Sequence, residues 1–200
     1  MRRAIVTRKS RETHVAVTLS LDGKGKTSVK TGISFLDHML TLLGTHGLFD
    51  LSVKARGDLD VDVHHTNEDV GLALGEAFHT ALGNHVGIWR FGWAYVPMEE
   101  AMARVVLDIS GRPKLVFRDQ RRIRKRLKGS GTAYQWEDVE HWLESFVRAA
   151  KFTVHVDVFS GEDFHHTCEA VFKALARALN QATQRDARVR GVPSSKGRLS

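Results

Sequence analysis

Hydrophobic residues along this chain follow two different periods. Stretches in which apolar and polar residues alternate, or in which apolar residues run together, predict β-strands. They cover residues 3–8, 14–21, 27–30, 48–55, 91–96, 104–109, 114–117 and 151–159. Stretches with an apolar residue every three or four positions predict helices, and these run from 34 to 44 or 47, from 64 to about 83, from 137 to 150, and from 165 to about 183. The order is therefore strands, helix, strand, helix, and it occurs twice.

Turn and capping residues add detail to this pattern. Asp22-Gly23, with Gly25 just beyond, is typical of a β-hairpin. We therefore expect strand 14–21 to turn back onto strand 27–30 in an antiparallel sheet. Ser34 stands where the N-cap of the first helix is expected.

The last helix repeats the second one. DVHHTNEDVGLALGEA, residues 62–77, returns as DFHHTCEAVFKALARA, residues 163–178, at an offset of 101 residues. Such self-similarity predicts a duplicated half-domain. We expect an α+β fold with a first half-repeat at 1–88 and a second at 89–200, in which helices gather on one face of the sheet. We expect the two halves to pack into one compact unit, with a C-terminal tail in the second half.

Composition and charge narrow the class of protein. The chain has 200 residues, of which 42% are hydrophobic and 26% charged, which suits one domain or two closely packed halves. Cys168 is the only cysteine, which excludes an intrachain disulfide, and we expect it to be buried and not to bind metal. No apolar run approaches the roughly 20 residues that cross a bilayer, and the N-terminus lacks the apolar centre of a secretory signal. We expect no membrane partner and a cytoplasmic location, or a plastid one if a transit peptide has been removed. The formal charge of +7 favours anionic partners without choosing among them.

Each copy of the repeat opens with a His-His-x-x-Glu cluster at the start of a helix. His64 and Glu68 are four residues apart and share one face of the helix, whereas His65 is rotated by roughly 100° and faces elsewhere. Imidazole and carboxylate at this spacing are typical of a divalent-metal site without thiolates. The alternative is a helix N-terminus that is merely rich in polar residues.

The helix before each cluster carries one further histidine, His38 in the first half and His141 in the second. A site made within one half would need neighbouring histidines to converge, which helical geometry resists. Crossed sets satisfy the geometry better. We therefore predict two metal sites, one with His64, Glu68, His141 and His166, and one with His165, Glu169, His38 and His65. Such sets leave positions open on a six-coordinate ion such as manganese.

Two further segments carry candidate chemistry. A basic run at 118–128 favours either nucleic-acid binding or a solvated loop, and the second is the better interpretation because no aromatic residue is interleaved for stacking on bases. The tail around Ser194, Ser195 and Lys196 offers hydroxyls and a cation suited to a phosphate, although it could also be a disordered end. His46 lies at the end of the helix whose start is expected near a metal site. The other histidines outside the repeated motifs, His14, His79, His85 and His155, lack such a position.

These motifs together resemble those of the imidazoleglycerol-phosphate dehydratases, hydro-lyases of histidine biosynthesis. The resemblance covers nearly the whole chain and rests on two long histidine motifs. It extends to Glu12-Thr13, FLDHML at 35–40, RFG at 90–92, PMEEA at 97–101, SGRP at 110–113 and PSSKG at 193–197. The chain departs from the usual pattern at Glu99, Phe164, Cys168 and 118–128.

The resemblance implies a fold similar to ribosomal protein S5 domain 2. It also implies two manganese ions per active site and a shell of 24 chains built from trimers, with active sites between subunits. One chain would then supply His64 and Glu68, while a neighbour supplies His141 and His166. The implied reaction converts D-erythro-imidazole glycerol phosphate into imidazole acetol phosphate by loss of water, with the substrate ring bound as imidazolate and passing through a diazafulvene. No nucleic-acid partner is implied.

The resemblance also assigns roles to single residues. Glu12 becomes the candidate for acid/base catalysis or substrate contact, beside the two carboxylates Glu68 and Glu169. His38 and His46 become candidates for substrate contact. The implied contacts to the phosphate come from Arg90, Arg112, Lys173, Ser194, Ser195 and Lys196.

Two other functions compete on the residues alone. The first is a dimetal hydrolase that uses metal-bound hydroxide on a phosphorylated or amide substrate. The second is an RNA-binding module in which the basic run binds RNA and the histidines hold structural metal. Hydrolysis of a generic ester would favour the former, and salt-sensitive RNA binding that survives chelation would favour the latter.

Overall fold

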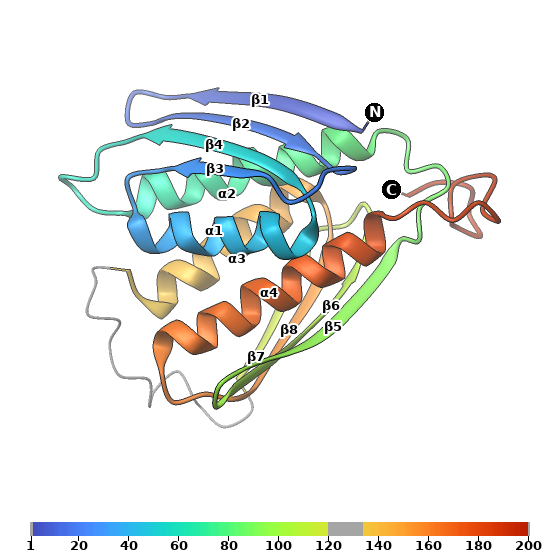
Figure 1. The fold of residues 1–200 in the computed structure, drawn as a ribbon. Coiled ribbons are helices and arrows are strands. Elements are labelled where there is room, and N and C mark those ends of the chain that lie inside the picture. Colours follow the sequence, from blue (N-terminus) through green and yellow to red (C-terminus); the bar gives the residue numbers. More distant parts are fainter. Residues whose placement is uncertain (1, 120–133, 200) are drawn as a thin grey trace.

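The computed structural model describes residues 2–119 and 134–199 (Figure 1). The first half contains β1 (Arg3–Lys9), β2 (His14–Ser20), β3 (Thr27–Lys30), α1 (Ser34–Gly47), β4 (Asp50–Arg56) and α2 (His64–Leu82). The second contains β5 (Phe91–Met98), β6 (Ala101–Asp108), β7 (Lys114–Asp119), α3 (Trp136–Ala150), β8 (Thr153–Ser160) and α4 (Phe164–Thr183). The predicted α+β fold with a duplicated half-domain is confirmed.

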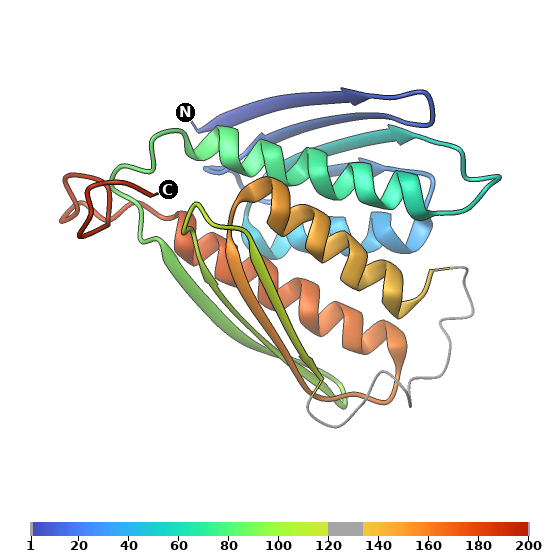
Figure 2. The same cartoon turned by 180° about the vertical axis from the view of Figure 1, so that it is seen from behind.

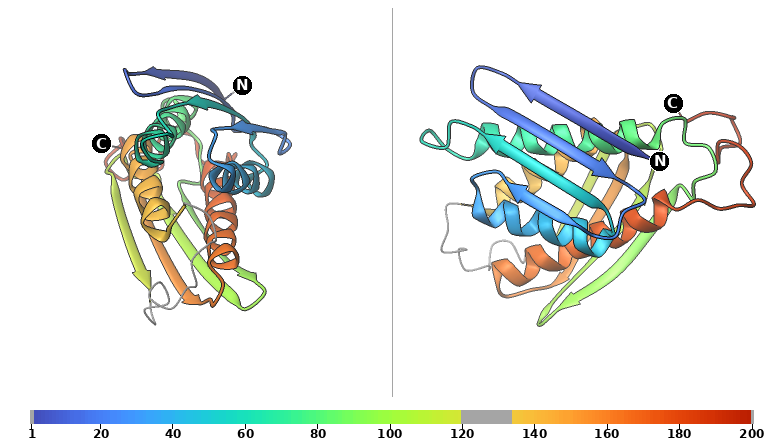
Figure 3. Two further views of the ribbon diagram at one scale, coloured as in Figure 1. Left: turned by 90° about the vertical axis from the view of Figure 1, so that its left-hand side faces the viewer. Right: turned by 45° about the horizontal axis from the view of Figure 1, so that its top comes forward.

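Each half forms its own four-stranded sheet, with the order β1-β2-β4-β3 in the first and β5-β6-β8-β7 in the second. In both sheets the third strand in sequence pairs in parallel with the last one, while the remaining pairs are antiparallel. The sheets lie on the outside, and all four helices lie between them (Figures 2 and 3). Each sheet is therefore covered by helices on one face only. The two halves meet helix against helix, mainly α2 on α3 and α1 on α4.

The predicted hairpin between β2 and β3 is wrong. β2 pairs with β1 and β4, and β3 lies beyond β4 in a parallel pair. The glycines serve the crossover instead: a Cβ on Gly23 would come within 2.2 Å of the Asp50 backbone nitrogen, and Gly25 has φ +81°. The carboxylate of Asp50 accepts backbone hydrogen bonds from Lys24 (2.8 Å) and Lys26 (3.0 Å), which holds the loop over the start of β4.

The predicted cap of α1 by Ser34 is also wrong. Ser34 is the first helical residue, and Ile33 occupies the N-cap position without a side-chain cap. Asp37 in the first turn binds the preceding loop instead, because its Oδ1 accepts the backbone N–H of Thr31 at 2.8 Å. The loop before the helix is thus tied down from inside the helix.

Close helix packing sets the position of the histidine-bearing helix starts. Where α2 crosses α3, a Cβ on Gly75 would lie 2.4 Å from the carbonyl oxygen of Phe146, so only glycine permits this approach. Trp142 and Phe146 stack there at 5.3 Å, and both are fully buried. Burial of side chains of this size contributes about 1.5–3 kcal/mol each.

Two further predictions concern single features. Cys168 is buried as expected, and burial raises the pKa of its thiol well above the usual range. Across residues 2–119 and 134–199, we find no helix with both the length and the apolar character needed to span a membrane. Most of the basic run at 118–128 lies outside the described residues.

Candidate metal centres

All four helices begin at the same end of the molecule, on the left of Figure 1. The two histidine motifs open α2 and α4, and His38 and His141 lie in the second turns of α1 and α3. Duplication thus places two similar sets of ligands at one end of the helical layer. Among the described residues, two groups have three potential ligand atoms within 4.8 Å of one another.

The first group consists of His38, His165 and Glu169. The Nε2 atoms of His38 and His165 lie 2.8 and 2.9 Å from Oε1 of Glu169, so both imidazoles share one carboxylate oxygen. The other oxygen accepts a hydrogen bond from Nζ of Lys173 at 2.5 Å. Burial alone raises the pKa of Glu169, but hydrogen bonds from Lys173, His38 and His165 outweigh it and hold that pKa at about 2. The carboxylate is therefore anionic at neutral pH.

The second group consists of His64, Glu68 and His141. The rings of His64 and His141 stack at 4.3 Å, which brings an imidazole of α2 against one of α3. Glu68 accepts a hydrogen bond from Arg148 at 2.6 Å. Nδ1 of His141 is buried without a hydrogen-bond partner. Each carboxylate is thus balanced by a cation, Lys173 in one group and Arg148 in the other.

Both groups fit a divalent cation. Each offers imidazole nitrogens and one carboxylate oxygen and no thiolate, a donor set that suits manganese, iron or zinc. Three ligands leave at least one position open on a four-coordinate ion and three on a six-coordinate ion.

The structure brings together three of the four predicted ligands in each set. His65 and His166 lie apart from both groups, because neighbouring residues on a helix are rotated by about 100°. The predicted division between chains is wrong for His141, which lies with His64 and Glu68 in the same chain. A fourth ligand is therefore not supplied within a single chain by the predicted sets.

His65 and His166 contact acidic residues instead. Nδ1 of His65 lies 2.9 Å from Asp58 and 3.8 Å from Glu12, and Nδ1 of His166 lies 2.8 Å from Glu100. Hydrogen bonds to these carboxylates raise the pKa of both histidines. Sequence reasoning did not single out Asp58, Glu100 or Arg148; only Glu100 lay within a recognised motif, PMEEA.

Glu12 lies in the turn between β1 and β2. Its side chain is 55% exposed and borders a cavity of about 260 Å³ that Asp58 also lines. An exposed carboxylate beside a cavity can reach a bound molecule and exchange protons with it. The structure thus places Glu12 where an acid/base role is possible.

The predicted phosphate contacts divide into two places. Arg90 forms hydrogen bonds of 2.7 and 3.0 Å with Asp108 and donates a third, of 2.8 Å, to the carbonyl oxygen of Pro193. It therefore anchors the tail that carries Ser194, Ser195 and Lys196, and exposed Arg112 lies in the loop after β6. This end of the molecule is opposite the helix starts (Figure 1).

Lys173 and His46 lie nearer the first ligand group. Lys173 contacts both Glu169 and the sulfur of Met98, at 2.5 and 3.2 Å. Burial, and then the nearby Lys173 and Arg177, lower the pKa of His46. His46 is consequently a neutral donor or acceptor near that group at neutral pH.

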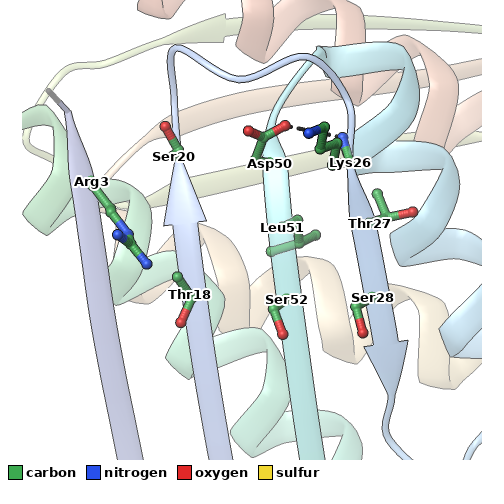
Figure 4. A pocket seen from close by; sticks show the side chains of 9 residues that line it. All are labelled: Arg3, Thr18, Ser20, Lys26, Thr27, Ser28, Asp50, Leu51 and Ser52. Atoms are coloured by element: carbon green, nitrogen blue, oxygen red, sulfur yellow. Dashed lines mark hydrogen bonds between the residues drawn. The ribbon is translucent and has the colours of Figure 1, made fainter.

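A cavity of about 320 Å³ lies elsewhere, on the outer face of the first sheet (Figure 4). Arg3, Lys26 and the hydroxyls of Thr18, Ser28 and Ser52 line it. It contains none of the predicted site residues. This cavity is therefore not part of the site formed by the histidine groups.

Comparisons with known proteins agree with this geometry. Residues 31–179 match a family model described as imidazoleglycerol-phosphate dehydratase. The chain is similar to imidazoleglycerol-phosphate dehydratases of Methylobacterium radiotolerans (49% identity over 200 residues) and Thermoanaerobacter pseudethanolicus (50% over 199 residues), with 100% of each chain covered.

Solved structures give the same result. The fold resembles the Staphylococcus aureus imidazoleglycerol-phosphate dehydratase with a TM-score of 0.78 and 34% identity, covering 92% of this chain and 100% of the other. It also resembles the Pyrococcus furiosus protein in complex with (S)-C348, with a TM-score of 0.81 and 33% identity, covering 96% and 99%. The family match spans both ligand groups, and the full-length relatives extend it to Glu12 and the tail.

Proposed function

The chain belongs to the imidazoleglycerol-phosphate dehydratase family of hydro-lyases, and from this premise we propose that it converts D-erythro-imidazole glycerol phosphate into imidazole acetol phosphate. The observation that carries the proposal is the pair of ligand groups, each with two histidines and one glutamate, at the starts of duplicated helices. Cations that bind the ring nitrogens of an imidazole substrate would promote its dehydration as Lewis acids, and these groups have the donors to hold such cations.

The cofactor in this proposal is a pair of manganese ions per active site. His38, His165 and Glu169 would hold one, and His64, Glu68 and His141 the other. When bound, the two ions would act as Lewis acids and as a template for the substrate ring in its imidazolate form. Glu68 and Glu169 contribute the negative charge that offsets part of the charge of each ion.

The chain's own residues would carry the remaining chemistry. Glu12 would accept or return a proton at its exposed carboxylate. Lys173, Arg90 and Arg112 would bind the phosphate by charge-assisted hydrogen bonds, together with Ser194, Ser195 and Lys196 in the tail. His38 and His46 would contact the substrate near Lys173.

The proposed active site lies between subunits of a homo-oligomer, for which we propose 24 chains built from trimers. Two observations support a shared site. The tail held by Arg90 and the ligand groups lie at opposite ends of one chain, and His65 and His166 remain outside their predicted groups, with side chains 39% and 34% exposed. Copies placed end to end could combine these parts.

The test is a dehydration assay combined with metal analysis. The purified protein should bind manganese and convert imidazole glycerol phosphate into a product that has lost one water and carries a ketone. Turnover should stop on chelation and return with manganese. Absence of product from manganese-loaded protein would overturn the proposal, and ester hydrolysis would favour the dimetal hydrolase.

The related proteins include bacterial ones, in keeping with a cytoplasmic enzyme, and none supports the plastid alternative.

A further inference from the structure

The two histidines outside the ligand groups have the same arrangement. Each points Nδ1 at a carboxylate and leaves Nε2 uncommitted among the contacts of the described residues. We propose that Asp58 and Glu100 are positioning residues that fix His65 and His166 in the tautomer with hydrogen on Nδ1. Their bare Nε2 atoms can then complete the metal sites of neighbouring copies. This inference rests on the proposed metal-dependent function.

Hydrogen bonds to both carboxylate oxygens of Glu100 hold its contact with His166 in place. Oε2 of Glu100 accepts the hydrogen of His166 Nδ1 at 2.8 Å. The other carboxylate oxygen accepts backbone hydrogen bonds from Glu162 (3.1 Å) and Asp163 (2.9 Å), in the loop before α4. Because a carboxylate with both oxygens engaged has one fixed orientation, it also fixes the imidazole ring that it binds. A neutral imidazole with hydrogen on Nδ1 exposes its lone pair at Nε2.

His65 is also held through Nδ1 by a carboxylate, but this carboxylate comes from a different loop. Oδ2 of Asp58 lies 2.9 Å from His65 Nδ1, and the Asp58 side chain is 22% exposed. Asp58 follows β4, whereas Glu100 lies between β5 and β6. The two acids therefore do not occupy corresponding positions in the repeat. Carboxylate–histidine pairs of this kind orient metal ligands and raise their basicity.

The two halves of the duplicated fold can be compared at Glu12 and Glu100. Glu12 and Glu100 both lie in the turn between the first two strands of their half, and both face the second histidine of the cluster. Glu100 binds His166 at 2.8 Å, but Glu12 remains 3.8 Å from His65 because Asp58 holds that nitrogen. Asp58 thereby releases Glu12 from a positioning role and leaves its carboxylate available for proton transfer. Of the two corresponding glutamates, one is fixed and one is free to act.

The test replaces Glu100 by Gln, and manganese binding is measured by calorimetric titration with metal analysis. The amide can offer an N–H to His166, which favours hydrogen on Nε2 and blocks ligation. We expect one of the two manganese sites to weaken by about 10- to 100-fold while the other keeps its affinity. Glu162→Gln, in the loop that Glu100 contacts, removes the same charge and should bind manganese as the unmodified protein does. Glu100→Asp, which keeps a carboxylate, should lose less affinity than Glu100→Gln.

A second measurement reads the tautomer without metal. ¹⁵N spectra of histidine-labelled, metal-free protein, recorded at alkaline pH where imidazoles are neutral, should show His65 and His166 with hydrogen on Nδ1. Glu100→Gln should convert His166 to the Nε2 form, and Asp58→Asn should do the same for His65.

The outcomes separate the inference from the function on which it rests. Equal manganese affinity in folded Glu100→Gln and the unmodified protein, or an unchanged His166 tautomer, would overturn the positioning role. Unmodified protein that binds no manganese would instead overturn the proposed cofactor. If Glu100→Gln does not fold, the Asp58→Asn variant decides by the same two measurements.

Discussion

Replacement of Glu169 by Gln tests both the stability and the metal chemistry of the first ligand group. The Glu169 side chain is 9% exposed, and its carboxylate accepts hydrogen bonds from His38, His165 and Lys173. These contacts lower its pKa from 4.5 to about 2. At about 1.4 kcal/mol per pKa unit, the native contacts of the anion stabilise the metal-free protein at neutral pH by up to about 3 kcal/mol. The variant should lose a substantial part of that stability.

The pH dependence of the unfolding free energy follows from the lowered pKa of Glu169. A carboxylate whose pKa is lowered on folding contributes stability that is fully present above its unfolded pKa. That contribution is lost as pH falls from about 4.5 to about 2. Glu169→Gln and the unmodified chain should therefore differ in unfolding free energy at pH 7, and the difference should narrow toward pH 2.

The assay is denaturant unfolding in chelator at both pH values and one protein concentration, followed by manganese analysis at pH 7. The variant should bind about half of the manganese that the unmodified protein binds, because one of two ligand groups loses its anion. Glu144→Gln, at an exposed position on α3, is the matched control and should change neither quantity. Equal stability at pH 7 together with full manganese content would refute the reasoning.

Four further predictions test other parts of the molecule. Arg112→Ala should raise KM for the phosphorylated substrate by roughly 10- to 100-fold at unchanged metal content, since a charge-assisted hydrogen bond contributes about 1.5–3 kcal/mol; steady-state kinetics that show an unaltered KM exclude this contact. Glu12→Gln should lower kcat by about 10²–10⁴ while manganese still binds, and retention of turnover would remove Glu12 from the proton transfer. Prolonged chelation should reduce a large particle to smaller oligomers, with trimers expected, and manganese should restore size and activity together. If light scattering shows the same particle mass after verified metal removal, the prediction that metal holds the subunits together is wrong. Gly75→Ala should lower the unfolding midpoint, because the added Cβ meets the Phe146 carbonyl at 2.4 Å; an unchanged midpoint would show that the helices can shift apart at little cost.

Much of the fold follows from the sequence because periodicity and repeats are local properties. The alternation of apolar residues predicted eight strands and four helices at nearly their observed positions, and the recurrence of HHxxE after 101 residues predicted the duplication. The same local geometry predicted that His64 and Glu68 share a helix face, as His165 and Glu169 do. These features depend on residues within one or two turns of each other.

Strand pairing needed the tertiary structure. The Asp22-Gly23 signal is compatible with a hairpin, but β4 occupies the place beside β2 and moves β3 to its far side. A local turn preference cannot decide which strands pair, because the hydrogen bonds between β2 and β4, whose partners run from Ser20 with Asp50 to His14 with Arg56, outweigh it. The same applies to Gly75, whose role depends on how closely α3 approaches.

The site was likewise only partly determined by sequence. Spacing identified eight candidate metal ligands, yet only the structure placed His141 beside His64 and turned His65 and His166 toward Asp58 and Glu100. Arg148, which pairs with Glu68, lies 80 residues away and had no signal in the sequence. Sequence specifies which donors a helix face presents, because that follows from the helical repeat. Which acid or cation meets each donor is a contact between distant segments, and it is decided by the packing of the whole chain.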